Sequence, residues 1–359
     1  TNVSRNASTG YYECNGTGSA TLSFPKKYLV KIVVEPCKPL AFKQIATLDT
    51  KGSDFNSFSY SNGYFWAATY GGYIYRSNDA INWSNSADVS YILPVFSGFT
   101  SFLICPIYFN YDKYIAMGCR GNMTISSDGF NWSSSIDTVH SYFNSMSGDD
   151  LRGACDYNGT LIMIGRFGSI IKTNDGGANW QISYQQLKNS LYQRSGNELY
   201  GICCSSNKLL ALGHKGYLCT STDGGGTWSS VDQKIKFASF VNSITRACAY
   251  GHNKFWAVTE SGCFASSIDA DLWVEEACST EFLGDIQRIV FAKGRLYLIT
   301  NNGYVYVEDL DNISGNFCCN NLIYPSGSYC TLKNKIYSIE NRREFYIEPS
   351  QISGTTISF

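Results

Sequence analysis

The sequence has few of the residues that build a metal centre or a redox motif. Only three histidines occur in 359 residues, and they lie far apart at His140, His214 and His252. The 14 cysteines include no C-x-x-C pair, so the spacing typical of zinc sites and thioredoxin-like motifs is missing. We therefore expect no metal and no cofactor, and no motif assigns a catalytic residue.

Charge is also scarce, which narrows the classes of partner. Charged residues make up 16% of the chain and the net charge is −1, which argues against a general nucleic-acid or anionic-membrane surface. One uncharged stretch, residues 89–110, is long enough to span a bilayer. It contains Pro94, Gly98 and Pro106, which favour two strands around a turn over a membrane helix. We therefore expect no transmembrane span.

The cysteines and glycosylation motifs indicate an oxidising, extracellular compartment, so we expect a secreted or cell-surface glycoprotein. An even number of cysteines without metal spacing is best explained by disulfides. We pair Cys14 with Cys37; the adjacent pairs Cys203–Cys204 and Cys318–Cys319 are candidates for vicinal bridges or for bonds to independent partners, and the connectivity stays open. Eight Asn-x-Ser/Thr motifs agree with secretion, at Asn2, Asn6, Asn15, Asn82, Asn122, Asn131, Asn158 and Asn312. Asn82 and Asn131 precede Trp inside turns, where crowding would disfavour a glycan.

A repeat organises most of the chain. Seven segments of alternating apolar residues begin at Phe65, Tyr114, Leu161, Leu209, Phe255, Leu296 and Ile336, spaced by 49, 47, 48, 46, 41 and 40 residues. Seven positions after this anchor stands Gly in six copies and Arg343 in the seventh. Alternation around a Gly turn is the pattern of an antiparallel hairpin. The regular period predicts an all-β, seven-bladed β-propeller, with six blades as the alternative.

Five copies continue into a turn spelled Ser/Thr-x-Asp followed by Trp. The Asp oxygens are suited to accept backbone N–H groups two or three residues on, and the Trp ring is suited to cover the turn. We expect structural roles for the fifteen residues Ser77, Asp79, Trp83, Ser126, Asp128, Trp132, Thr173, Asp175, Trp180, Ser221, Asp223, Trp228, Ser267, Asp269 and Trp273.

At these residues the chain resembles the Asp-box (bacterial neuraminidase repeat, BNR) propellers, a superfamily that includes sialidases, sortilin-type receptors and a photosystem II assembly factor. The resemblance covers residues 41–359. It implies a fold, not an activity, because the family holds both enzymes and binding proteins. It also implies that the Asp turns lie between the third and fourth strands of each blade, away from the ligand face.

Residues 1–40 lie outside the repeat and form a predicted glycosylated, disulfide-containing N-terminal extension before the propeller of residues 41–359. We expect Phe42 to Leu48, or the nearby YLVKIVV, to supply the outer strand of the last blade and so close the ring. The C-terminal TTISF is the alternative for that role. Cysteines recur on the innermost strands, at Cys155, Cys203 and Cys330, with Cys248 one position earlier; these are expected to be buried thiols or disulfide members.

The ligand face of such a propeller is formed by the turns between second and third strands and by the loops that enter each inner strand. Together these positions give a mixed, basic rim, and the candidate binding residues are Tyr70, Arg120, Arg152, Arg166, Tyr200, His214, Lys215, Arg246, Arg288 and Arg342. Bidentate Arg contacts suit an acidic peptide, a glycan carboxylate or a sulfate.

These features favour a non-catalytic receptor, ligand or adhesin that binds an extracellular protein or glycan through one propeller face. A sialidase-like or other glycoside hydrolase is the first alternative, because Arg152, Arg246 and Arg288 occupy equivalent places. The Arg-Ile-Pro signature of sialidases is absent, and no Tyr–Glu pair or carboxylate pair is marked by spacing. A structural matrix or coat protein is the second alternative.

Overall fold

The chain divides into two compact units. The structure, a computed structural model, describes residues 40–88, 104–109, 113–117, 123–133, 151–165, 168–185 and 199–310, together with six short strands outside this range. The central unit is Leu40–Asp309, and the terminal unit combines Thr1–Pro39 with Leu310–Phe359. Each unit is considered by itself below.

Antiparallel sheets make up the described part of the central unit, five of four strands and one of three. The first sheet holds β6 (Phe55–Ser61), β7 (Tyr64–Thr69), β8 (Tyr73–Ser77) and β9 (Ser84–Asp88). The second holds β10 (Ile104–Phe109), β11 (Lys113–Met117) and β12 (Met123–Ser126). The third holds β13 (Leu151–Tyr157), β14 (Thr160–Gly165), β15 (Ser169–Thr173) and β16 (Gln181–Gln185).

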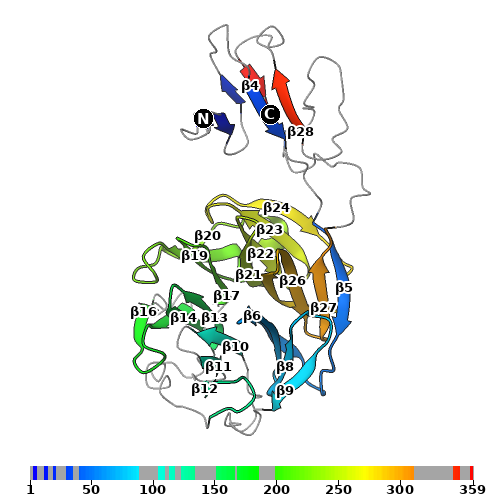
Figure 1. Ribbon diagram of the computed structural model, residues 1–359. Helices are drawn as coiled ribbons and strands as arrows, with labels where there is room; N and C mark the ends of the chain where they lie inside the picture. Colours follow the sequence, from blue (N-terminus) through cyan, green and yellow to red (C-terminus); the bar gives the residue numbers. More distant parts are fainter. Residues whose placement is uncertain are drawn as a thin grey trace. The chain divides into compact units, whose positions relative to one another are not determined.

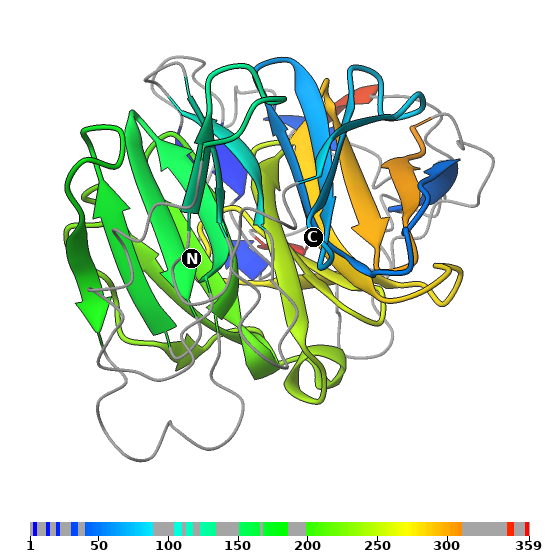
Figure 2. The ribbon, with the colours of Figure 1, turned by 90° about the horizontal axis from the view of Figure 1, so that it is seen from below.

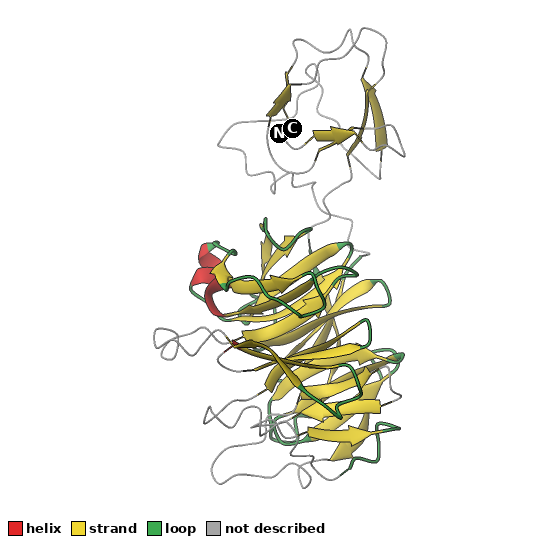
Figure 3. Ribbon diagram, turned by 90° about the vertical axis from the view of Figure 1, so that its left-hand side faces the viewer, coloured by secondary structure: helices red, strands yellow, loops and turns green. Residues whose placement is uncertain are grey.

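The remaining sheets follow the same plan. The fourth sheet holds β17 (Leu199–Cys204), β18 (Leu209–Gly213), β19 (Tyr217–Ser221) and β20 (Asp232–Gln233). The fifth holds β21 (Thr245–Gly251), β22 (Lys254–Thr259), β23 (Cys263–Ser267) and β24 (Val274–Cys278). The sixth holds β25 (Ile286–Ala292), β26 (Arg295–Thr300), β27 (Tyr304–Glu308) and β5 (Phe42–Thr47). Two short helical turns, η3 (His214–Gly216) and α2 (Ala238–Val241), adjoin the fourth sheet (Figure 3).

The first strands of the six sheets form a closed ring. Contacts run from β6 to β10, β13, β17, β21 and β25 and back to β6. Figure 1 looks into this ring, and Figure 2 gives the view turned by 90° about the horizontal axis. The central unit is therefore a β-propeller, as the repeat predicts.

The second strand of each sheet is buried on both faces. In β14, Leu161 to Gly165 are all buried, and β18 and β22 repeat this pattern. A strand sandwiched between two neighbouring sheets exposes neither face, so its sequence reads as a continuous apolar run instead of an alternating one. Side chains of adjacent sheets share one core in each case, for example around Phe65, which packs against Tyr297 of the sixth sheet at 4.7 Å between ring centroids.

The ring is closed by the N-terminal strand β5. It pairs antiparallel with β27, from Phe42 opposite Glu308 to Thr47 opposite Tyr304, and Asp309 N donates to Ala41 O at 2.8 Å. This confirms that Phe42 to Leu48 supplies the outer strand of the last sheet. Such a strand removes the open edge that a linear array of sheets would leave.

The sheets differ from a seven-bladed ring. The seventh repeat copy lies in the terminal unit, where β28 (Arg343–Ile347) pairs with β4 (Val30–Val34), the strand within YLVKIVV. The TTISF alternative for ring closure is wrong, because β29 (Thr356–Ser358) pairs with β3 (Ser19–Thr21); β1 (Val3–Arg5) pairs with β2 (Tyr12–Cys14). The terminal unit thus takes up both chain ends, which departs from the predicted 41–359 propeller. An alternating segment fits any antiparallel partner, so its pattern alone does not choose the sheet.

Within the described residues, no helix is long and apolar enough to cross a membrane. Residues 89–103, the greater part of the uncharged stretch, lie outside the described ranges. The last part of that stretch is the strand β10, as predicted for one of its two strands.

Candidate binding site at the centre of the propeller

One face of the ring collects the turns between second and third strands and the starts of the first strands. Backbone hydrogen bonds join these segments from one sheet to the next: Ile286 N donates to Glu260 O, and Phe55 N donates to Asn301 O at 2.8 Å. A further hydrogen bond joins two such segments of the first sheet. Tyr70 N, in the turn between β7 and β8, donates to Asp54 O, directly before β6, at 2.9 Å. The two classes of loop that define the predicted ligand face therefore do lie together. We call it the turn face.

A bulge marks the start of the first strand in five of the described sheets. The pairing register shifts by one residue there, so that a single residue has no partner on the second strand. The unpaired residues are Asn56, Arg152, Tyr200, Arg246 and Gln287. Because a bulge changes the direction of its side chain, each of these sheets offers one polar side chain at the turn-face end of its inner strand.

Tyr200 lies at the middle of a cationic cluster. The guanidinium carbon of Arg152 lies 5.3 Å from its ring centroid and that of Arg246 lies 5.1 Å away, both within cation–π range. The Tyr200 hydroxyl is 3.1 Å from Nε2 of His214 in η3, and the two rings meet edge to face. These residues come from three successive sheets, so the cluster exists only in the closed ring.

Two further side chains complete the cluster. Glu260 pairs with Arg246 at 3.4 Å, and burial raises the pKa of Glu260 while the Arg246 charge opposes that rise. Arg288 reaches from β25 to β13 and donates to the backbone carbonyl of Arg152 at 2.7 Å, as well as to that of Gln287. We call Arg152, Tyr200, His214, Arg246, Glu260 and Arg288 the central cluster. Three guanidiniums and one carboxylate leave two positive charges there, counting His214 as neutral.

The ten predicted rim residues fall into three groups by their place in the structure. The structure brings together Arg152, Tyr200, His214, Arg246 and Arg288 in the central cluster. Tyr70 and Lys215 lie on turns of the same face, Tyr70 half-buried and Lys215 exposed with a positive φ of 55°. Arg120, Arg166 and Arg342 lie outside the described residues.

Asn56 and Gln287 were not among the predicted site residues, although both stand at the bulge position. A weak signal exists in the sequence: the bulged residue follows a large apolar residue and precedes a small one in Phe55-Asn56-Ser57, Leu151-Arg152-Gly153 and Leu199-Tyr200-Gly201. The alternation of apolar and polar residues does not by itself distinguish such a bulge position from the start of a strand without a bulge.

The Ser/Thr-x-Asp turns lie at the opposite end of the sheets, between third and fourth strands, and their geometry is structural. In the first, Asp79 Oδ1 accepts the backbone N–H groups of Ile81 and Asn82 at 2.9 and 2.8 Å, and the Ser77 hydroxyl donates to it. These bonds hold the pKa of Asp79 well below its usual range, with the Asn82 backbone bond contributing most. The same pattern lowers the pKa of Asp175 to about 2.

The other turns repeat this geometry. The Ser/Thr hydroxyl donates to the Asp carboxylate in Ser126–Asp128, Thr173–Asp175, Ser221–Asp223 and Ser267–Asp269. The Trp indole returns to a turn carbonyl in three turns, from Trp83, Trp180 and Trp273, whereas Trp228 donates to the Ser183 hydroxyl. In the Trp132 turn, the equivalent carbonyl of Gly129 accepts from Ser86 instead. Every one of these carboxylates is thus occupied by its own turn.

Two sequons fall inside these turns. The side-chain amides of Asn82 and Asn131 donate to Asp79 and Asp128, both at 2.8 Å. Asn158 is exposed in the turn between β13 and β14. The predicted glycosylation sites Asn2, Asn6, Asn15, Asn122 and Asn312 lie outside the described residues.

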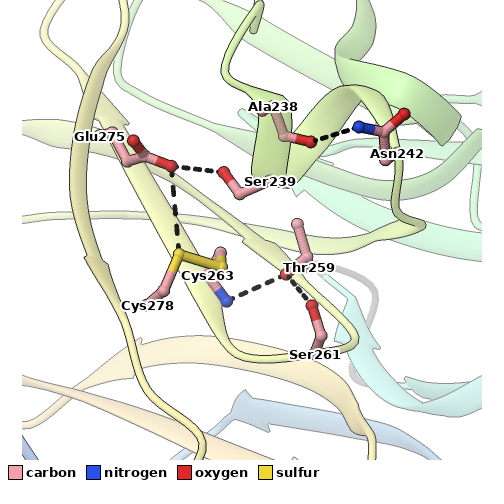
Figure 4. The surroundings of a disulfide bond; sticks show 8 residues. All are labelled: Ala238, Ser239, Asn242, Thr259, Ser261, Cys263, Glu275 and Cys278. Atoms are coloured by element: carbon pink, nitrogen blue, oxygen red, sulfur yellow. Dashed lines mark hydrogen bonds between the residues drawn. A yellow bond between two sulfur atoms is a disulfide. The ribbon is translucent and has the colours of Figure 1, made fainter.

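One disulfide occurs among the described residues, between Cys263 of β23 and Cys278 of β24 (Figure 4). Neither residue had been paired with the other from the sequence. Cys263 N donates to Thr259 Oγ1 at 3.0 Å, and Glu275, beside Cys278, accepts a hydrogen bond from Ser239 of α2 (Figure 4). The bond therefore ties the outer edge of the fifth sheet at the turn face.

The remaining described thiols are free, so a vicinal Cys203–Cys204 bridge is not formed. Adjacent residues of an extended strand point to opposite faces, which directs these two side chains to different neighbours. Cys155, Cys203 and Cys248 do lie on first strands, as the recurrence predicts. Cys14 has no described side chain, and Cys37, Cys318, Cys319 and Cys330 lie outside the described residues.

Among the described residues, no group of three or more His, Cys, Asp or Glu side chains is arranged to hold a metal ion. The central cluster has one carboxylate and one imidazole against three guanidiniums, a composition that suits an anion. Within the cluster, Arg246 Nε is buried without a hydrogen-bond partner among the described residues, and so is Oδ1 of Asn56 at the equivalent bulge of the first sheet. A buried polar atom without a partner is costly, and a ligand is one way of satisfying it.

The backbone is similar to those of solved β-propellers with varied activities. A catalytically inactive virginiamycin B lyase of Staphylococcus aureus, solved with quinupristin, gives a TM-score of 0.53 at 12% identity, covering 76% of this chain and 99% of that one. A putative gluconolactonase gives 0.52 at 10% identity, covering 77% and 97%. A Bacteroides thetaiotaomicron protein of unknown function gives 0.50 at 11%, covering 78% and 76%.

No protein-family model matches the sequence. No curated protein matches it either. At such low identities the structural likeness establishes the β-propeller fold and carries no activity with it.

Proposed function

We propose that this chain is a secreted or cell-surface binding protein that receives an anionic group of a protein or glycan at the central cluster. The observation that carries the proposal is the placement of Arg152 and Arg246 against the same Tyr200 ring, at 5.3 and 5.1 Å from its centroid, with Arg246 Nε buried and without a partner among the described residues. A carboxylate or sulfate bound by these guanidiniums would accept charge-assisted hydrogen bonds in a partly desolvated site.

Secretion is supported by the Cys263–Cys278 disulfide and by the exposed Asn158 sequon. A disulfide of this kind persists in an oxidising compartment. Treatment with peptide-N-glycosidase F after expression in a eukaryotic secretory host should reduce the mass of the protein. In the peptide that contains Asn158, this treatment should convert the asparagine to aspartate, which mass spectrometry detects.

We further propose that the ring belongs with the Asp-box propellers and has six blades, the three-stranded sheet counting as one of them. The hydrogen bonding of the five Ser/Thr-x-Asp turns supports the first part, and the closed contact path through six first strands supports the second.

A binding role is favoured over glycoside hydrolysis by the partners of the two candidate catalytic groups. Tyr200 is bonded to His214, and Glu260 is paired with Arg246. A sialidase-type nucleophile needs a Tyr activated by a neighbouring Glu, and the described residues of the central cluster hold no such pair. Arg288 also spends two of its N–H groups on backbone carbonyls instead of directing them toward a substrate.

The test is binding to an array of sialylated, sulfated and neutral glycans and to acidic peptides, followed by titration of the best ligand. Arg246→Met should weaken binding at least tenfold, because it removes a charged donor from a desolvated site. The matched control is Arg295→Met at the start of β26, at the opposite end of the sheet, which should leave the affinity within twofold.

Other outcomes would point to the alternatives. Turnover of a fluorogenic sialoside that is lost in Arg246→Met would establish a hydrolase. Saturable binding that Arg246→Met leaves unchanged would move the site elsewhere, and the absence of any saturable ligand would favour a structural coat or matrix role.

A further inference from the structure

Four free thiols lie on three successive first strands close to the ring axis. They are Cys155 on β13, Cys203 and Cys204 on β17, and Cys248 on β21. The first strands of neighbouring sheets run in the same direction and contact each other directly. Side chains that alternate along one strand therefore face the previous sheet and the next sheet in turn.

The alternation sorts the four thiols into two pairs. Cys204 faces β13, because its sulfur lies 3.4 Å from Asp156 O, next to Cys155. Cys203 faces the fifth sheet, where it shares a core cluster with Cys248 and Phe255. Cys248 in turn faces the fourth sheet, with its sulfur 4.0 Å from Leu210 O. Cys155 and Cys204 pack against another cluster, the one between the third and fourth sheets.

The backbones approach closely where the pairs form. A Cβ at Gly201 would lie 3.0 Å from both Ala247 Cα and Cys248 N, so β17 and β21 converge two residues before Cys203. On β13, a Cβ at Gly153 would be in ordinary van der Waals contact with the Ile202 side chain of β17, at 3.4 Å. Disulfides need Cα atoms within about 7 Å, and the backbone contact at Gly201 brings β17 and β21 close together two residues before Cys203.

The thiols of each pair are also within hydrogen-bonding reach of each other. A hydrogen bond between Cys155 and Cys204 raises the pKa of Cys155 and lowers that of Cys204. Burial, and then a hydrogen bond with Cys248, raises the pKa of Cys203. Cys219 differs, because only burial acts on it and raises its pKa to about 12.

We propose that Cys155 with Cys204, and Cys203 with Cys248, form two disulfides that staple the first strands of the third, fourth and fifth sheets together. The oxidant is a small disulfide of the glutathione class. A protein thiolate attacks one sulfur of the oxidant and expels a small thiolate, and its paired thiolate then attacks the mixed disulfide and expels the second. Two protein thiols are oxidised, the oxidant is reduced to two thiols, and the two protons pass to the departing thiolates.

The half-buried pair reacts first. Cys204 is the more acidic thiol of its pair and is partly exposed, so it is the attacking nucleophile, with Cys155 as the resolving thiol. Cys203 and Cys248 are 8% and 6% exposed, so their bond forms during folding or through local opening of the sheet interface.

The experiment uses the full chain, equilibrated in a glutathione redox buffer, quenched with N-ethylmaleimide, digested without reduction and mapped by mass spectrometry. The expected product is one species of three linked peptides, containing Cys155, Cys203–Cys204 and Cys248, about 4 Da lighter than its reduced parts. Cys263–Cys278 is the internal standard for oxidation, and Cys219 should carry the maleimide.

Two matched variants distinguish the connectivity. Cys204→Ser should leave Cys155 alkylated and Cys203–Cys248 linked, whereas Cys203→Ser should leave Cys248 alkylated and Cys155–Cys204 linked. Oxidation of the wild type should raise the thermal midpoint by roughly 5–15 °C. Alkylation of all four thiols while Cys263–Cys278 is oxidised, a Cys155–Cys203 link in Cys204→Ser, or links to other cysteines would overturn the proposal.

Discussion

At the residue scale, the most regular feature of the sequence is a set of carboxylates that accept hydrogen bonds from their own backbone. Asp175 accepts from Asn179 N and its side-chain amide and from the Thr173 hydroxyl, all at 2.8–2.9 Å. A carboxylate bonded in this way favours its ionised form in the folded state, which couples the turn to pH.

Asp175→Asn tests that coupling. The folded pKa of Asp175 is about 2, below the ordinary 3.8, so its contribution to stability is fully present above the unfolded pKa and is lost as pH falls toward the folded one. The thermal midpoint of the variant should lie below wild type at pH 7, and the difference should shrink between pH 4 and pH 2. Thermal scans by circular dichroism across pH 2–7 measure it; a difference that stays constant down to pH 2 would contradict the assignment.

The residues of these turns could be predicted from the sequence because their chemistry is local: donor, acceptor and turn lie within seven positions. The central cluster could be predicted only in part. Arg152 and Arg246 follow from repeat position, whereas the equivalent place in the sixth sheet is Gln287, so the predicted equivalence of Arg288 is off by one residue. The contact of Arg288 with Arg152 O joins residues 136 positions apart. The contacts between thiols of different sheets could not be predicted for the same reason, because no local pattern in the sequence shows which first strands lie next to each other.

At the scale of the element, the first strands combine a bulge with a close approach to the next sheet. The bulge aims Tyr200 and Arg246 into the cluster, and the small residues that follow, Gly201 and Ala247, let the strands meet. The hairpins were predicted from alternating apolar residues, but the second strands are buried without interruption because a neighbouring sheet covers each of their faces. The bulges were not predicted, because inserting one residue preserves composition and changes only register.

Gly201→Ala should destabilise the protein by about 1–3 kcal/mol, because the added methyl meets backbone atoms of Ala247 and Cys248 that cannot move independently. Urea denaturation followed by tryptophan fluorescence measures the change. Gly71→Ala is the matched control, since its added methyl meets mainly the movable Ser53 side chain. Equal losses in both variants would mean that glycine entropy, not strand approach, is responsible.

The pair β23–β24 offers a second prediction. Removing the Cys263–Cys278 bond, which closes a loop with a sequence separation of 15, should cost up to about 3 kcal/mol, mostly through the unfolded chain. The double variant Cys263→Ser/Cys278→Ser avoids leaving an unpaired thiol. Its urea midpoint should fall without a change in slope; an unchanged midpoint would show that the strand pairing alone holds this edge.

At the scale of the whole molecule, the ring depends on β5, a strand contributed from before the first repeat. Leu48, directly after this strand, is buried in the core between the first and sixth sheets, and Phe42 of β5 stacks on Phe264 of the fifth sheet at 5.1 Å between centroids. Ring closure was predicted because an open edge is unfavourable in any propeller. Seven sheets were predicted, with six only as the alternative, because the seventh copy has the same alternation as a blade strand, although it pairs with β4 instead.

A pair of fragments tests this closure. Residues 40–309 should fold to a monomer with cooperative thermal unfolding, whereas residues 49–309 should aggregate, because β27 then presents an unpaired edge over exposed core. A synthetic peptide of residues 40–48, added to the shorter fragment during refolding, should restore a soluble monomer by adding the missing strand. Size-exclusion chromatography reads both results; a soluble, cooperative 49–309 fragment without the peptide would contradict the role given to β5.

The pairing of β5 with β27 also sets how the central unit responds to mechanical load. The chain enters and leaves it at Ala41 and Asp309, which are hydrogen-bonded neighbours at one end of that antiparallel pair. Tension between the two flanking segments therefore pulls on the ladder from its end and opens its hydrogen bonds one after another, not all at once. We therefore expect the β5–β27 pair to resist such tension only weakly, because each hydrogen bond of the ladder carries the load in turn.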